Sequence, residues 1–150
     1  MKKLFRKILL PMQLEEGESD SAVKLARELA KRDNAKIILI HVVPMLATGD
    51  APMPVEYYKR KELEARKTLE RMARRFVSLK TEVVVECGEP AELILRIARE
   101  SDVAAIVMAT HGRRGLKHLL LGSVAERVVR EAHCPVIAMP PPASTEKPAH

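Results

Sequence analysis

Five short, almost unbroken apolar segments recur along this chain, and a pattern typical of a helix separates each from the next. The apolar segments cover residues 7–10, 36–43, 81–86, 103–108 and 135–139. The helical patterns cover residues 22–30, 55–78, 88–99 and 124–132. Strands buried on both faces read as continuous apolar runs, whereas strands with one exposed face alternate. The sequence therefore predicts an α/β fold, a parallel sheet with helices on both faces.

Length and composition indicate one domain with an aliphatic core. A chain of 150 residues has the size of one ordinary domain, and roughly 68–70% of its unfolded surface can be buried. Hydrophobic residues make up 47% of the chain and aromatic residues 3%, so the core must be aliphatic. Three prolines at positions 140–142 end the pattern. We expect one domain over residues 1–140 and a polar C-terminal tail over residues 141–150.

A glycine-rich connection follows the fourth apolar segment. Between Ala109 and Ser123 lie three of the six glycines of the chain, Gly112, Gly115 and Gly122. Glycine lets backbone N–H groups approach phosphate oxygens closely, and the helix expected next adds the positive end of its dipole. The same connection carries the basic residues Arg113, Arg114 and Lys117. This pattern predicts a phosphate-binding loop at the carboxyl end of a strand, where parallel sheets bind their ligands.

The connection also has a second interpretation, as a tight turn without a ligand. Ser123 and Glu126 have the spacing of a capping box, whose two side chains satisfy N–H groups at the start of a helix. The loop has neither the P-loop spacing nor the glycine fingerprint of dinucleotide-binding folds, so neither class is supported. The pattern alone leaves both interpretations open.

Charge and cysteine content restrict the partners and the compartment. A net charge of +6 suits anionic ligands. Nucleic acid is not an expected partner, because the basic residues are mixed with Glu along the helices and few aromatic residues could stack on bases. Cys87 and Cys134 lack metal or redox spacing and are expected to be buried, inert thiols. Since no segment reads as a signal or a membrane span, we expect a cytoplasmic location.

With the loop placed, the chain resembles the universal stress protein family over residues 5–140. The nucleotide-binding branch of that family carries G-x-x-G, nine residues and then G-[ST]. Here Gly112, the nine residues 113–121 and Gly122-Ser123 match the later part of that pattern. Flanking matches are I-V-M before the loop, L-L-L-G-S-V-A-E-R-V-V after it and C-P-V-I near the end. The resemblance implies a single open five-stranded sheet of order 3-2-1-4-5, Rossmann-like and of the adenine nucleotide alpha hydrolase type. It also implies a homodimer in which the last strands, from Pro135 to Met139, pair antiparallel.

The resemblance further implies a site for ATP, or for ADP or AMP, with Mg²⁺ or Mn²⁺ beside the phosphates. Val42 matches the position whose backbone holds the adenine. The positions that match the phosphate site are Gly112, Gly122 and Ser123, with the N–H of Val124 nearby. The other residues expected at the site are Pro11, Gln13, Met108, Ala109, His111 and Arg113.

Two of these positions depart from the family pattern. Gln13 stands where many nucleotide-binding members have Asp, and a neutral Gln accepts a weaker hydrogen bond than a carboxylate. Ala109 stands where the family has glycine at the ribose, and alanine would be strained if the position required a positive φ. The phosphate half of the site therefore matches the family, whereas the nucleoside half is altered.

The sequence supports two functions and argues against a third. The first is a stress-response protein that binds ATP as a homodimer and signals through its dimer surface or a protein partner. The second is a dimeric interaction scaffold of the same family without a nucleotide, which the departures at Gln13 and Ala109 favour. An ATP-hydrolysing enzyme is disfavoured because the loop has no Asp or Glu to hold Mg²⁺ or orient water, which leaves His111 as the expected acid–base candidate. We expect very slow hydrolysis at most.

Overall fold

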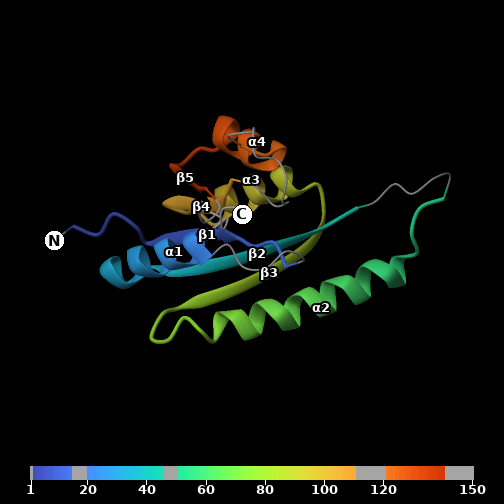
Figure 1. The fold of residues 1–150 in the computed structure, drawn as a ribbon, viewed down its shortest axis with the longest axis horizontal. Helices are drawn as coiled ribbons and strands as arrows, with labels where there is room; N and C mark the ends of the chain where they lie inside the picture. The colour runs from blue at the N-terminus through green and yellow to red at the C-terminus, as the bar shows by residue number, and fades with distance from the viewer. Residues whose placement is uncertain (1, 15–19, 46–50, 111–120, 141–150) are drawn as a thin grey trace, which may run out of the picture.

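The computed structural model describes residues 2–14, 20–45, 51–110 and 121–140 of the chain. The strands are β1 (Lys7–Pro11), β2 (Lys36–Pro44), β3 (Thr81–Gly88), β4 (Ala105–Ala109) and β5 (Val136–Met139). The helices are α1 (Asp20–Asp33), α2 (Val55–Ala73), α3 (Pro90–Glu100) and α4 (Ser123–Glu131) (Figure 1). The five strands form one parallel sheet in the order β3-β2-β1-β4-β5. This architecture confirms the predicted fold class and strand order.

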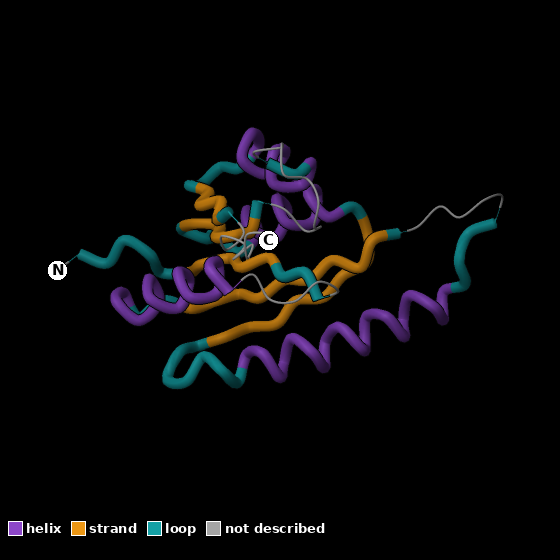
Figure 2. The backbone as a smooth tube through the Cα atoms, viewed as in Figure 1, coloured by secondary structure: helices purple, strands orange, loops and turns teal. Residues whose placement is uncertain are grey.

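Helices cover both faces of the sheet, α1 and α2 on one and α3 and α4 on the other (Figures 1 and 2). Within β2, Ile37 and Leu39 pack toward α1 and α2, whereas Ile38 and Ile40 pack toward α3 and α4. None of these four side chains is more than 2% exposed. Successive residues of a strand point to opposite faces, so a strand covered on both faces places consecutive residues in apolar surroundings. This explains the unbroken apolar segments in the sequence.

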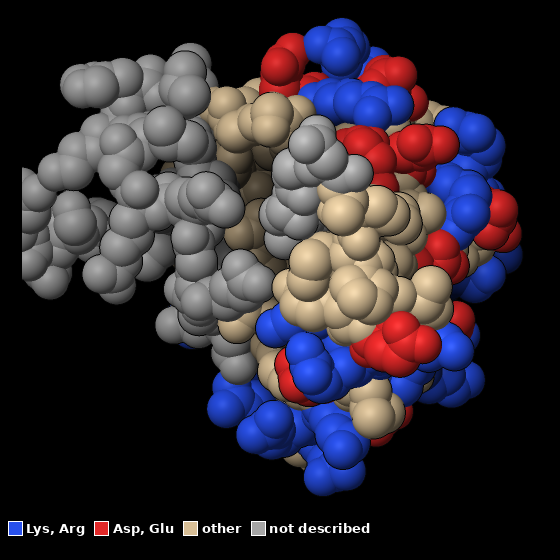
Figure 3. Space-filling model, turned by 90° about the vertical axis from the view of Figure 1, so that its right-hand side faces the viewer, with Lys and Arg blue, Asp and Glu red and all other residues tan. Residues whose placement is uncertain are grey.

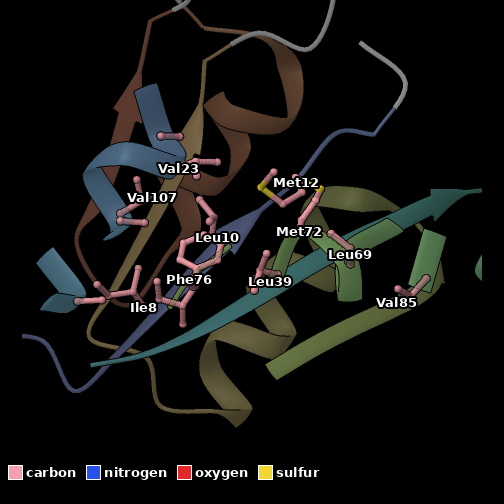
Figure 4. Close-up of a cluster of buried hydrophobic side chains, with 14 of the residues drawn as sticks. Ile8, Leu10, Met12, Val23, Leu39, Leu69, Met72, Phe76, Val85 and Val107 are labelled. Carbon is pink, nitrogen blue, oxygen red and sulfur yellow. The ribbon is translucent and has the colours of Figure 1, made fainter. Parts of the chain in front are cut away.

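The layer between the sheet and α1 and α2 is largely aliphatic, as the composition predicts. Figure 4 shows side chains of α2 (Leu69 and Met72) and of the sheet (Ile8, Leu10 and Leu39) in this layer. Full burial of one such side chain contributes about 1.5–3 kcal/mol relative to leaving it in water. Packing of this kind holds the strands whose carboxyl ends form the candidate site.

Helix α2 ends at Ala73, so the predicted extension of this helix to residue 78 is wrong. The N–H groups of Arg75 and Phe76 donate to carbonyls three residues earlier, and Ser78 has a positive φ of 66°. Phe76 is nevertheless 4% exposed, because this tight turn carries it into the same core. The burial of Phe76 therefore continues the helical spacing of apolar residues beyond the end of the helix.

Strand β4 begins at Ala105, two residues later than the predicted segment. Val103 is buried, but its N–H donates to the Ala98 carbonyl at the end of α3. It therefore belongs to the connection that enters the strand.

Among the described residues, none of the helices is both long and apolar enough to cross a membrane.

Candidate functional site

The order of strands reverses between β1 and β4, which are neighbours although β2 and β3 lie between them in the chain. In open α/β sheets, ligands bind beyond the carboxyl ends of the strands at such a point. Three of the predicted site residues lie at this edge. Pro11 ends β1, Ala109 ends β4 and Val42 lies near the end of β2. The fold thus gathers residues from three separate parts of the chain at one edge of the sheet.

The segment that follows β1 is held against β2 by two hydrogen bonds. The backbone N–H of Met12 donates to the Ile40 carbonyl oxygen at 2.8 Å, and Nδ1 of His41 lies 2.8 Å from the Met12 carbonyl oxygen. Met12 is buried, whereas Gln13, which follows it, is exposed. The backbone that presents Gln13 is therefore anchored on the strand that carries Val42.

The sequence places His41 at the carboxyl end of its strand, but it was not among the predicted site residues. The sequence does contain an indication of a role, since His41 is the one polar residue between Ile37 and Val43 in an otherwise apolar strand. What could not be foreseen is its partner, because Met12 lies 29 residues earlier in the chain.

Val42 and Met108 bring backbone rather than side chain to the edge. Their side chains are 9% and 5% exposed and belong to the core under α3 and α4. A ligand at this edge can therefore meet the main chain of Val42, which is the kind of contact that the family resemblance implies for the adenine.

Thr110 joins the two ends of the glycine-rich connection. Its backbone N–H donates to the Met139 carbonyl of β5 at 2.9 Å, and its carbonyl accepts from the Gly122 N–H at 2.8 Å. Thr110 itself is buried. The loop therefore leaves and re-enters the fold at one point, beside the carboxyl end of β4. His111, Gly112 and Arg113 lie outside the described residues.

Gly122 is the N-cap of α4, and no side chain caps this helix. Its φ of −70° and ψ of 166° form an extended conformation that any residue can adopt. Backbone freedom therefore does not explain the glycine at this position. A glycine here does leave the start of α4 open to close approach by an anion, where unpaired N–H groups and the helix dipole favour negative charge.

The predicted capping box at Ser123 is not formed. Ser123 is the first residue of α4 rather than its cap, and its side chain is exposed. The carboxylate of Glu126 instead accepts from Arg130 Nη1 at 2.6 Å. A capping box needs the Ser one position earlier, in the extended conformation that Gly122 adopts. The interpretation of this segment as a locally capped turn is thereby weakened.

Ala109 shows no sign of the strain considered from the sequence. Among the described residues other than glycine, φ is positive at Asn34, Ser78 and Asp102. Ala109 is instead an ordinary strand residue that pairs in register with Met139. The effect of this departure is therefore limited to the space that its methyl group occupies.

The two cysteines are free and half-buried rather than buried as expected. Burial, followed by the hydrogen bond and charge of Glu62, raises the pKa of the Cys87 thiol to about 12. Burial also raises the pKa of Cys134. Both thiols stay protonated at neutral pH, and a protonated thiol is a poor nucleophile and metal ligand.

The surface near this edge carries charge of both signs. Figure 3 shows Lys and Arg gathered at the height of α2 and interleaved with Asp and Glu at the height of α3 and α4. On α4, Arg127 pairs with Glu89 and Glu131, each at 2.7 Å. Exposed pairs of this kind contribute little to stability, typically about 0–1 kcal/mol. No group of three or more His, Cys, Asp or Glu in the described part of the chain could hold a metal ion.

Comparisons with known proteins agree with this architecture. The model of the universal stress protein family matches residues 4–140. The universal stress protein MJ0531 of Methanocaldococcus jannaschii is 36% identical over 146 residues, covering 93% of this chain and 84% of that protein. The structure of the universal stress protein UspA from Lactobacillus plantarum superposes with a TM-score of 0.75 at 20% identity, covering 89% of this chain and 97% of that one.

Two further solved structures of the same fold contain nucleotides. A universal stress protein from Archaeoglobus fulgidus in complex with dAMP has a TM-score of 0.64 at 21% identity, covering 90% of this chain and 98% of that one. A universal stress protein in complex with cAMP has a TM-score of 0.66 at 18% identity, covering 91% and 97%. At these identities the likeness shows the fold alone. The match of the family model over nearly the whole chain shows that this chain belongs to the universal stress protein family.

Proposed function

We propose that this chain binds an adenine nucleotide, ATP ahead of ADP or AMP, at the carboxyl edge of β1, β2 and β4. The observation that carries this proposal is the uncapped start of α4 at Gly122, which Thr110 ties to the end of β4 at the reversal of strand order. An N-terminus of a helix without a side-chain cap offers N–H groups to phosphate oxygens. The dAMP and cAMP complexes of proteins with the same fold support an adenine nucleotide as the ligand.

The proposed binding mode divides the site into two halves. The adenine lies against the backbone of Val42 and the ribose near Gln13 and Ala109. The phosphates lie at Gly122, Ser123 and Val124. Pro11 and Met108 complete the edge, His111, Gly112 and Arg113 are proposed loop contacts, and Mg²⁺ or Mn²⁺ accompanies the phosphates. In this proposal the protein is a cytoplasmic homodimer that regulates a stress response by binding, and it hydrolyses ATP very slowly at most.

The first experiment identifies the ligand. The purified protein is denatured by heat, and any released nucleotide is identified by chromatography. An adenine nucleotide in the supernatant supports the proposal. If none is released and calorimetry detects no binding of ATP, ADP or AMP at millimolar concentration, the alternative of a scaffold without a nucleotide is favoured. The altered positions Gln13 and Ala109 are the observation behind that alternative.

The second experiment locates the phosphates. Because Gly122 has a conformation open to any residue, Gly122→Val should fold normally while its side chain blocks the start of α4. We expect Gly122→Val to abolish ATP binding in calorimetry, whereas Gly122→Ala, the smaller matched change, retains part of the affinity. If Gly122→Val binds ATP as the wild type does, the phosphates do not lie at α4.

The third experiment tests the nucleoside half. Hydrogen bonds to charged acceptors contribute about 1.5–3 kcal/mol against about 0.5–1.5 kcal/mol for neutral ones. Gln13→Asp should therefore tighten ATP binding by about fivefold. Ala109→Gly should tighten it further only by making room for the sugar, since Ala109 carries no positive φ. An unchanged affinity of Gln13→Asp would show that residue 13 does not contact the nucleotide.

A further inference from the structure

The imidazole of His41 interrupts the apolar run of β2 at the candidate site. It follows Ile40 and precedes Val42, and its backbone lies in register with Val85 of β3. The ring is half-buried, and its Nδ1 lies 2.8 Å from the Met12 carbonyl oxygen. A half-buried polar ring on an otherwise apolar strand is costly unless it is hydrogen-bonded, so this contact explains why the ring is tolerated at this position.

The chemistry of the two atoms assigns the proton. A carbonyl oxygen can only accept a hydrogen bond, so Nδ1 of His41 must carry the hydrogen and donate it to Met12. This leaves Nε2 as the atom without the proton in the neutral ring. The donated hydrogen bond therefore selects the Nδ1–H tautomer.

The same contact engages the second backbone group of Met12 with β2, this time through a side chain of the strand. The N–H of Met12 donates to the Ile40 carbonyl at 2.8 Å, and its carbonyl accepts from His41. With both backbone groups engaged on one strand, Met12 cannot shift without breaking one of these bonds. Gln13 is the next residue, so its position relative to Val42 depends on this pairing.

We propose that His41 is a positioning residue for the nucleotide site: it locks the segment Met12–Gln13 onto β2, so that Gln13 meets the ribose while Val42 meets the adenine. This inference rests on the function proposed above. A segment that is already ordered loses less conformational freedom when the ligand binds, so the hydrogen bond contributes to affinity without touching the nucleotide.

Two near-isosteric substitutions separate this role from general packing. In His41→Asn the amide nitrogen can take the place of Nδ1, whereas in His41→Gln it takes the place of Nε2. Both changes remove the imidazole ring, so both variants lose the packing contacts that the ring makes. We expect His41→Gln to weaken ATP binding by about threefold to tenfold and His41→Asn to stay within about twofold of the wild type, as calorimetry measures it. Urea unfolding of both variants shows that the protein remains folded.

Two further measurements test the route of the effect. Nitrogen-15 NMR of the wild type should show His41 as the Nδ1–H tautomer. In a Gln13→Ala background, the loss caused by His41→Gln should shrink, because the two residues act as one unit. Equal affinities of the Asn and Gln variants, an Nε2–H tautomer, or an undiminished loss in the Gln13→Ala background would each overturn the role of His41. A wild type that binds no adenine nucleotide would overturn the proposed function itself, before any variant is compared.

Discussion

Gly88 ends β3 with a φ of +154°, and a Cβ placed there would lie 2.9 Å from Cδ1 of Leu93. Both the backbone and the space therefore oppose a side chain at this position. Gly88→Ala should lower the free energy of unfolding by about 1–3 kcal/mol, measured by urea denaturation. Ser78→Gly tests the converse change, the removal of a side chain at a positive φ, because Ser78 has a φ of 66° and is exposed. It should raise stability by up to about 1 kcal/mol. A stable Gly88→Ala protein would mean that β3 ends differently in solution.

Asp33 secures the N-terminal segment. One carboxylate oxygen accepts from the N–H groups of Leu4 and Phe5, each at 2.7 Å, and the other from Nε of Arg32 at 2.9 Å. The hydrogen bond from Arg32, then that from Phe5, lowers the pKa of Asp33 from 3.8 to about 2. Between these values the unfolded chain takes up a proton that the folded chain does not, so the stability due to this carboxylate is complete above pH 4 and is lost as the pH falls toward 2.

Asp33→Asn should therefore destabilise the protein most at neutral pH. The difference in free energy of unfolding between variant and wild type should be constant from about pH 5 to 7 and shrink between pH 4 and pH 2. Urea denaturation at each pH measures it. A difference that does not change with pH would show that Asp33 acts through its shape rather than its charge.

At the scale of elements, Glu89 connects two helices of the same layer. It is the N-cap of α3 and accepts from the N–H groups of Ala91 and Glu92 at 3.2 and 2.7 Å. The same carboxylate accepts from Nη1 of Arg127 in α4 at 2.7 Å. The cap satisfies N–H groups that have no partner within the helix, whereas the pair with Arg127 is exposed to water and screened.

Replacing each partner should rank these two roles. Glu89→Ala should cost about 0.5–2 kcal/mol of stability through the lost cap, and Arg127→Ala at most about 1 kcal/mol. Added salt should reduce the effect of Arg127→Ala more than that of Glu89→Ala. Thermal unfolding at low and high salt measures both. If Arg127→Ala proves the more damaging change, the link between α3 and α4 outweighs the cap.

At the scale of the whole molecule, β5 is an edge strand with one side unpaired in the described chain. The carbonyls of Met139 in β5 and of Pro135, which directly precedes the strand, face β4 and accept from the N–H groups of Thr110 and Ile106. Because the backbone groups of successive strand residues point to alternate sides, those of Val136 and Ala138 point away from β4, toward the open edge of the sheet. An exposed apolar edge favours pairing with a second chain. Two copies of β5 related by a two-fold axis would pair antiparallel and satisfy each other's unpaired backbone groups.

We therefore expect a homodimer through residues 135–139, with about twice the mass of the 16.8 kDa chain in light scattering. Ala138→Pro removes an outward N–H and leaves the pairing with β4 intact, so this variant should be a folded monomer. A wild type that stays monomeric at micromolar concentration, or an Ala138→Pro variant that remains a dimer, would exclude this interface.

The layered fold could be predicted from the sequence, because the inner strands β1, β2 and β4 are buried on both faces and are therefore apolar along most of their length. The run of β2 from Ile37 to Ile40 is explained by cover on both faces, and five such segments alternating with helical patterns predicted the parallel sheet. With the family resemblance the sequence also predicted the strand order, which then brought Pro11, Val42 and Ala109 to one edge. The assignment of these residues to a nucleotide remains a prediction.

The contacts that join distant parts of the chain could not be predicted from the sequence and became visible in the folded protein. His41 meets Met12 across 29 residues, Arg127 meets Glu89 across 38, and Thr110 pairs with both Gly122 and Met139. The end of α2 and the cap of α4 were likewise not predictable from the sequence. Phe76 is buried although it lies outside the helix, and the N-cap of α4 is Gly122 rather than Ser123. Hydrophobic periodicity reports which face of a segment is buried, but not which backbone conformation delivers that burial or which remote group supplies a hydrogen bond. The backbone conformation and the hydrogen-bond partners depend on how the sheet and the helices pack against each other, and a local sequence pattern contains no information about that packing.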